Sequence, residues 1–92
     1  MTLSAAYPVP DVDWSIPVKV DLTSPCPKTV AWKIVTTASR VVARGSVLVQ
    51  GKATVAWDQE DLKGQRVSNG VYYFVAQETG LHALRAKILL LR

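Results

Sequence analysis

Hydrophobic and polar residues alternate with a period of two along most of the chain, which is the pattern of β-strands that bury one face. The helical spacing i, i+3, i+4, i+7 never persists for three turns, so at most one helical turn is expected, near residues 59–62. The segments with strand patterning are 16–22, 30–36, 41–42, 47–49, 53–57, 71–78 and 83–91.

Turn-forming residues separate these segments. Pro25 and Pro27 cannot donate hydrogen bonds to a central ladder, so a strand is expected to break there. Further turns are expected at 69–70 and 79–80, where a glycine follows Asn or Thr. About seven antiparallel strands at this spacing are typical of an Ig-like or fibronectin-like β-sandwich. The pattern therefore predicts an all-β fold of this type.

The length of 92 residues allows one small domain. Residues 1–15 contain Pro8 and Pro10 and predict an irregular N-terminal segment or linker that packs on the sandwich, whereas residues 16–92 predict a single Ig-like domain. Hydrophobic residues make up 49% and charged residues 20%, a globular balance that excludes disorder. No apolar stretch approaches the roughly 20 residues of a membrane-spanning helix, and no signal-peptide pattern opens the chain.

The chain carries a net charge of +4, with 11 basic and 7 acidic residues. The basic residues are spread singly from Lys19 to Arg92, and several alternate with apolar neighbours as solvent-facing strand positions do. Nucleic-acid-binding proteins usually gather their basic residues on one face or along one helix. The distribution along the sequence therefore favours a soluble surface, and no nucleic-acid partner is expected.

One cysteine and one histidine leave little room for catalytic or metal chemistry. Cys26 excludes an internal disulfide and a thiolate metal cage, and we expect it to be a half-buried small hydrophobe. His82 lies beside an expected turn, and no nucleophile elbow or oxyanion-hole glycine cluster accompanies it. The sequence therefore predicts no catalytic residue, no metal and no cofactor, and the protein is not expected to be an enzyme.

The most specific stretch is residues 55–74, which read VAWDQEDLKGQRVSNGVYYF. This stretch resembles the FlgD-type Ig-like domain, a fibronectin-like domain first named in the flagellar hook-capping protein. Such domains are also widespread at the C-termini of secreted and cell-surface bacterial proteins. Where the family motif has a glycine, this chain has Gln59. The matching positions are Trp57, Asp58, Asp61, Gly64, Val67, Gly70, Val71 and Tyr72, in the pattern W-D-x-x-D-x-x-G-x-x-V-x-x-G-x-Y.

The resemblance covers residues 7–92. Residues 7–10 are similar to the family's opening Y-P-N-P, with Val9 in place of Asn. Residues 34–42 are similar to its I-Y-D-x-x-G-R-x-V, with Thr36 for Asp and Ser39 for Gly. The last six residues, KILLLR, resemble the K-x-L-x-R terminus of secreted members.

Each of the main motif residues has a structural interpretation independent of the family. Trp57 has inward strand parity and is expected to fill the core. Asp58 and Asp61 follow at the strand end, where short carboxylates accept unpaired backbone N–H groups. Glycines 64 and 70 allow positive φ, and Tyr72 has the position of a tyrosine corner. The motif therefore indicates a fold and not a reaction.

Two ligand-binding alternatives are weaker. Carboxylates at 58, 60 and 61 are candidate calcium ligands, but they lack the alternate spacing of a calcium loop, so turn capping is favoured. A carbohydrate-binding platform needs several exposed coplanar rings. Trp32 and Trp57 have core parity, and Trp14 is expected to pack over one end of the sandwich. This leaves Tyr73 as the main exposed candidate.

The last strand loses its alternation at its end. Residues 88–91 are apolar on both faces, because Leu89 and Leu91 stand where polar residues would continue the alternation. The face that carries these two leucines is therefore either covered or prone to association. We expect the N-terminal segment around residues 7–14 to cover it, which keeps the isolated domain monomeric. If that segment is a mere linker, Leu89 and Leu91 become a docking surface.

The resemblance implies a non-catalytic C-terminal Ig-like accessory domain of a secreted or surface bacterial protein, serving as a spacer, anchor or sorting module. A first alternative is a protein-binding domain of a flagellar hook-cap-like assembly, and a second is a carbohydrate-binding module. The expected partners are other domains of the same polypeptide or a surface or secretion assembly. The expected location is extracellular or at the cell surface, and the chain is either an excised piece of a longer protein or a short natural gene product.

Overall fold

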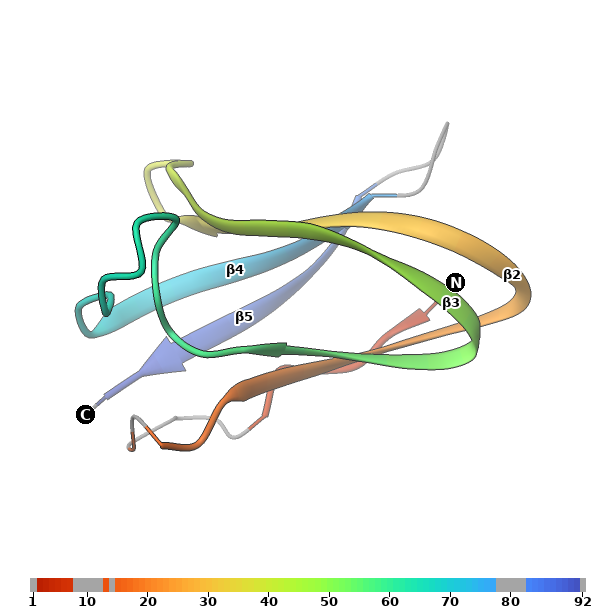
Figure 1. Ribbon diagram of the computed structural model, residues 1–92, viewed down its shortest axis with the longest axis horizontal. Helices are drawn as coiled ribbons and strands as arrows, with labels where there is room; N and C mark the ends of the chain where they lie inside the picture. Colours follow the sequence, from red (N-terminus) through yellow and green to blue (C-terminus); the bar gives the residue numbers. More distant parts are fainter. Residues whose placement is uncertain (1, 8–12, 14, 78–82, 92) are drawn as a thin grey trace.

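Antiparallel β-strands make up the fold in the computed structural model, which describes residues 2–7, 13, 15–77 and 83–91 (Figure 1). These residues contain no helix, so the predicted all-β class is confirmed, and residues 59–62 form no helical turn. The strands are β1 (Thr2–Leu3), β2 (Val18–Thr36), β3 (Val41–Trp57), β4 (Gly70–Gln77) and β5 (Leu84–Leu90).

The long hairpin of β2 and β3 takes part in both layers of the fold. The first half of β2 pairs with β1 and with the end of β3, whereas its second half pairs with the start of β3 and with β4. Strand β5 pairs with β4. The first layer thus consists of β1, the first half of β2 and the end of β3. The second layer consists of the second half of β2, the start of β3, β4 and β5. In Figure 1 the hairpin bends so that its two halves face each other, and a single curled sheet thus encloses the core.

About seven strands were predicted, whereas the described residues form five. The expected break at the two prolines is a bulge inside β2. Ser24 pairs with Gly51 and Lys28 with Val49, so residues 25–27 lie opposite a single residue of β3. A bulge bends a strand and leaves its extra residues unpaired, which accommodates prolines without ending the strand. Strand β2 therefore contains two of the seven expected segments and β3 contains three.

Cys26 is exposed in this bulge, and the prediction that it is half-buried is wrong. The buried residue of the bulge is Ser24, which is 1% exposed. Its hydroxyl donates to the Cys26 carbonyl oxygen at 2.7 Å and accepts the Cys26 N–H at 3.4 Å. The buried Ser24 hydroxyl thus forms hydrogen bonds with both backbone polar groups of Cys26, whose side chain faces outward.

The core lies between the two halves of the curled sheet and is built from alternate residues of each strand. Its most buried large side chains, each less than 2% exposed, are Leu22, Ile34, Phe74, Ile88 and Leu90. Within the described residues, no helix has the length and apolar character that crossing a membrane requires.

Residues 2–7 of the N-terminal segment lie against β2. Thr2–Leu3 forms β1 beside β2, and the Tyr7 hydroxyl donates to the Asp21 carboxylate at 2.9 Å. The side chain of Ala6 is 2% exposed. Pro8, Pro10 and Trp14 lie outside the described residues, and the domain boundary near residue 15 stays a prediction.

Candidate functional site

The loop between β3 and β4 is anchored by Trp57, the last residue of β3, which is 4% exposed. Its indole N–H donates to the Glu60 carbonyl oxygen at 3.0 Å. Its ring meets Tyr72 edge to face, with centroids 5.6 Å apart and an interplanar angle of 63°. The two aromatic residues of the motif thus hold the start and the end of the loop together.

The motif carboxylates accept hydrogen bonds from the backbone of this loop. One Asp61 oxygen accepts the N–H groups of Lys63 and Gln65, each at 2.9 Å. An Asp58 oxygen accepts the Glu60 N–H at 3.2 Å. The bond from Gln65 is the main cause that lowers the pKa of the Asp61 carboxyl. Both aspartates therefore act as turn caps.

The remaining motif residues close the loop. Gly64 has a φ of +77°, which a side chain would strain. Gly70 begins β4, and Val67 is 8% exposed in the core. The Tyr72 hydroxyl donates to the Ser68 carbonyl oxygen at 2.7 Å, which is the bond of a tyrosine corner. All of these residues therefore have structural contacts.

Gln59 replaces the family glycine and has a φ of +66°. Its side chain is 0% exposed, and its amide nitrogen donates to the carbonyl oxygens of Ile16 at 2.9 Å and Asp13 at 3.3 Å. The side chain therefore ties the loop to the chain just before β2. The sequence indicated only the missing glycine, and a polar residue in the loop gave no signal of this burial.

The turn between β2 and β3 departs from the family pattern at two positions with different outcomes. Thr36 stands where the pattern has Asp and caps the turn, because its hydroxyl accepts the N–H groups of Ala38 and Arg40, each at 3.2 Å. Ser39 stands for Gly and keeps a φ of +65° on an exposed residue. The position thus retains the backbone conformation that glycine adopts at low cost.

The loop carboxylates do not form a metal cluster. Across residues 2–7, 13, 15–77 and 83–91, no three or more His, Cys, Asp or Glu side chains gather to hold a metal ion. The negative charge of Asp58 raises the pKa of the Glu60 carboxyl, so these two groups repel each other. Because oxygens of Asp58 and Asp61 already accept backbone N–H groups, we expect millimolar calcium to leave the melting temperature unchanged.

Asp61→Asn is expected to lower the melting temperature at neutral pH, because the amide accepts the same N–H groups more weakly than a carboxylate does. The folded-state pKa of Asp61 is lowered, so its contribution is present above the unfolded value of about 4 and is lost as the pH falls through the folded value. Melting curves between about pH 3 and pH 7 test this.

Glu60→Gln is the matched control for that pH series, because the pKa of Glu60 is shifted in the opposite direction to that of Asp61. The folded-state pKa of Glu60 is raised, so the ionised group destabilises the fold at neutral pH and this penalty disappears on acidification. Glu60→Gln should therefore melt higher than the native protein at neutral pH and equally at acid pH. A deficit of Asp61→Asn that persists unchanged at low pH would contradict the capping role.

Leu89 and Leu91 lie at the end of the chain as the sequence suggested, but they differ in exposure. Leu89 is opposite Val71 in the ladder and is half-buried, whereas Leu91 follows β5 and is 51% exposed. Most of the segment 7–14 that was expected to cover them lies outside the described residues. Their role as a docking surface stays a prediction.

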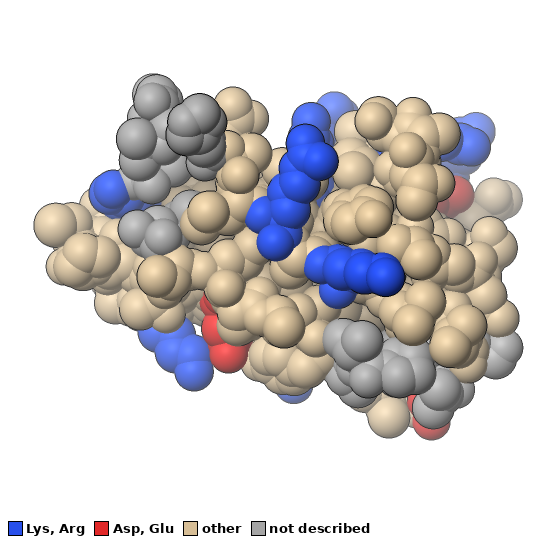
Figure 2. Space-filling view, turned by 180° about the vertical axis from the view of Figure 1, so that it is seen from behind, with Lys and Arg blue, Asp and Glu red and all other residues tan. Residues whose placement is uncertain are grey.

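The outer face of the second layer carries basic residues that are far apart in the sequence. The register places Arg44 opposite Lys33, Lys33 opposite Val75 and Val75 opposite Arg85. Lys87 lies two residues along β5, on the same face as Arg85. In Figure 2, Lys and Arg side chains lie across the middle of one face, with no Asp or Glu among them. Sequence reasoning missed this gathering because it depends on the register.

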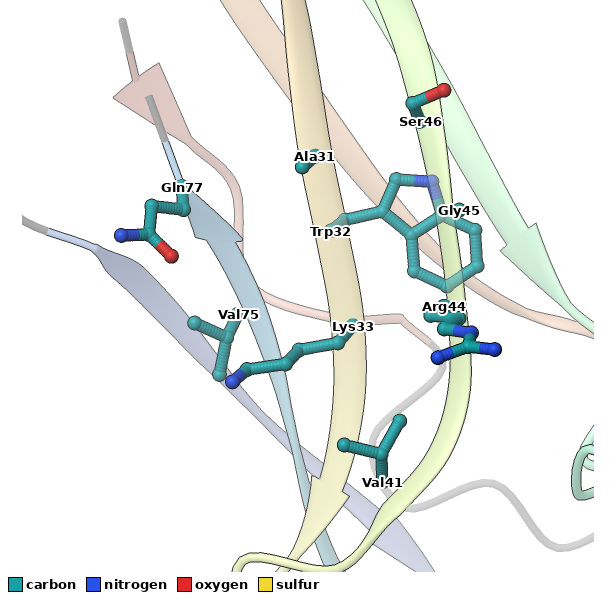
Figure 3. Close-up of a pocket in the computed structure, with 9 residues that line it drawn as sticks. All are labelled: Ala31, Trp32, Lys33, Val41, Arg44, Gly45, Ser46, Val75 and Gln77. Atoms are coloured by element: carbon teal, nitrogen blue, oxygen red, sulfur yellow. The ribbon is translucent and has the colours of Figure 1, made fainter. Parts of the chain in front are cut away.

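A groove of about 640 Å³ opens on this face (Figure 3). In the close-up the indole of Trp32 lies over Gly45, the Arg44 guanidinium is beside it, and Lys33 extends toward Val75. Trp32 is half-buried, less than its inward parity suggested, because its ring reaches the edge of the sheet. The groove residues are Ala31, Trp32, Lys33, Val41, Arg44, Gly45, Ser46, Val75 and Gln77.

The aromatic residues of the described chain are mostly engaged in the fold. Trp57, Tyr72 and Phe74 are buried, and Tyr73, the expected exposed ring, is half-buried. Tyr7 is 41% exposed and bonded to Asp21. The carbohydrate-binding alternative stays a prediction.

The fold and the W-D loop define a FlgD-like β-sandwich domain. A comparison with solved structures finds the crystal structure of FlgD from P. aeruginosa, with a TM-score of 0.65 and 26% sequence identity. The match covers 85% of this chain and 64% of that chain. The likeness agrees with the resemblance carried by the motif, and the FlgD-like fold is confirmed. No family model and no curated protein matches the chain.

Proposed function

We propose that the protein is a non-catalytic protein-binding domain of a flagellar hook-cap-like assembly. The observation that carries this proposal is the likeness to FlgD over 85% of the chain. The same likeness favours this function over that of a C-terminal accessory domain of a secreted protein, for which the comparisons give no support. A hook-cap-like role also implies an extracellular location at the cell surface.

The contacts of the loop support a role in binding rather than catalysis. The motif stabilises the domain, because hydrogen bonds join the loop backbone to the side chains of Trp57, Asp61 and Tyr72. Lys33 and Arg44 face outward on the second layer and line a groove there. An outward groove with charged side chains on its lining is suited to holding a partner protein.

The proposal is tested by direct binding to the flagellar hook subunit of the same organism. The 92-residue protein is immobilised, and the purified hook subunit is titrated over it in biolayer interferometry. We expect saturable binding, and none to an unrelated β-sandwich of similar basic charge. Absence of saturable binding to the hook subunit would overturn the proposed function.

A further inference from the structure

Two cations lie directly opposite each other on the outer face of the second layer. Lys33 on β2 is the register partner of Arg44 on β3. Like charges at opposed positions of an antiparallel pair are destabilising. Lys52 forms an ion pair with Asp21 on the other layer. Among residues 2–7, 13, 15–77 and 83–91, no carboxylate forms an ion pair with Lys33 or Arg44. The described residues therefore place two positive charges on neighbouring strands of this face without a carboxylate partner.

Trp32 provides a fixed apolar wall beside these charges. A Cβ atom on Gly45 would lie only 2.8 Å from Cζ2 of the indole, so the ring is packed on the bare backbone of β3. On the core side the ring stacks on Phe74, with centroids 5.6 Å apart and planes 19° apart. The ring is thus held in place before any ligand arrives, which lowers the entropy cost of binding.

The groove adjoins a strand edge that is open to pairing with an extended chain. Strand β3 pairs only with β2, so its other edge is free along Arg44, Gly45 and Ser46 within the described residues. A second hollow of about 200 Å³ continues the groove past Lys33 toward Arg85. Positive charges therefore flank the groove along its course from β3 to β5.

We propose that this groove binds an extended acidic segment of a partner protein. Carboxylates of the segment pair with Lys33 and Arg44 and remove their mutual repulsion, while an apolar side chain packs on the exposed edge of Trp32. This assignment deepens the proposed function by naming the surface and the chemistry of the partner.

The charge of the chain disfavours a second copy as the occupant. The net charge is +4, and self-association through this face would bring Arg44 and Lys33 against equal charges. Nucleic acid is disfavoured by the apolar lining of Val41 and Val75 and by the ring of Trp32, which already stacks on Phe74.

The probe is a short fluorescent peptide in which glutamates alternate with valines, and binding to the whole protein is followed by anisotropy. A peptide with glutamine at every glutamate position and a single-stranded DNA oligonucleotide of equal charge are the comparison probes. We expect the acidic peptide to bind, more weakly as salt is raised, and the glutamine peptide not to bind. Amide chemical shifts should change at Lys33 and at Arg44 to Ser46.

Single charge reversals test the site without weakening the fold. Lys33→Glu and Arg44→Glu each convert the like-charged pair into an opposite-charged pair, so neither should lower the melting temperature. Each should weaken peptide binding by about tenfold or more. The control Lys19→Glu makes the same charge change on an exposed residue in the first half of β2 and should alter binding by less than about twofold.

Binding that falls equally with Lys19→Glu, or survives both groove reversals, would overturn the proposal. Tighter binding of the oligonucleotide, lost in the same two variants, would overturn it in favour of a phosphate site. If the hook subunit binds Arg44→Glu unchanged, the proposed function stands and the groove assignment fails. If the acidic peptide binds at the groove and the hook subunit does not bind, the groove assignment stands and the proposed function fails.

Discussion

Trp57→Ala is expected to lower the free energy of unfolding by about 3–5 kcal/mol, the usual cost of removing a large buried ring from a core. The ring is 4% exposed and packs edge to face on Tyr72, so its loss leaves a cavity at the base of the loop. The Glu60 carbonyl oxygen loses its indole partner as well. A small domain has roughly 5–15 kcal/mol of stability in total, so the variant keeps only a small margin.

Urea unfolding followed by circular dichroism measures this loss, and Trp32→Ala is the matched control. Trp32 is half-buried, whereas Trp57 is buried and its indole N–H also donates to the Glu60 carbonyl oxygen. Removal of Trp32 is therefore expected to cost less than that of Trp57. Equal losses from the two variants, or a Trp57→Ala variant as stable as the native protein, would show that the Trp57 ring is not the anchor of the loop.

The position of Trp57 could be predicted because it depends on local properties. Strand parity places a residue on one face, and Trp57 follows Val55 on the buried face of β3. The same holds for the capping by Asp61 and for the tyrosine corner at Tyr72, since both are bonds within a few residues of the chain. Interactions between residues that are close in sequence can therefore be predicted from the residue pattern.

The curled hairpin and the basic face could not be predicted because they depend on pairing between distant segments. The prolines of β2 signal an interruption, but only the partner strand decides whether it becomes a turn or a bulge. Lys33, Arg44 and Arg85 are separated by many residues, and their gathering follows from the register of three ladders. A residue-by-residue pattern contains alternation but not register.

Gln59→Gly is expected to lower the free energy of unfolding by about 1–3 kcal/mol, although glycine is the family residue at this position. The substitution relieves the left-handed backbone, whose φ is +66°. It also removes a fully buried side chain and its two hydrogen bonds to the carbonyl oxygens of Ile16 and Asp13. Each lost bond costs about 1 kcal/mol, and the cavity adds to this, so the losses exceed the relief of about 1–2 kcal/mol.

Ser39→Gly is the matched contrast, because Ser39 has nearly the same φ of +65° but is exposed. At Ser39 only the backbone effect remains, which is a relief of about 1–2 kcal/mol less the roughly 0.5–1 kcal/mol entropy cost of glycine. Ser39→Gly should therefore raise the free energy of unfolding by up to about 1 kcal/mol. Gln59→Ala, which loses the bonds and keeps the strained backbone, should be the least stable of the three. Urea unfolding of the three variants gives the order directly. A Gln59→Gly protein more stable than the native chain would mean that its side-chain bonds to the N-terminal segment contribute nothing.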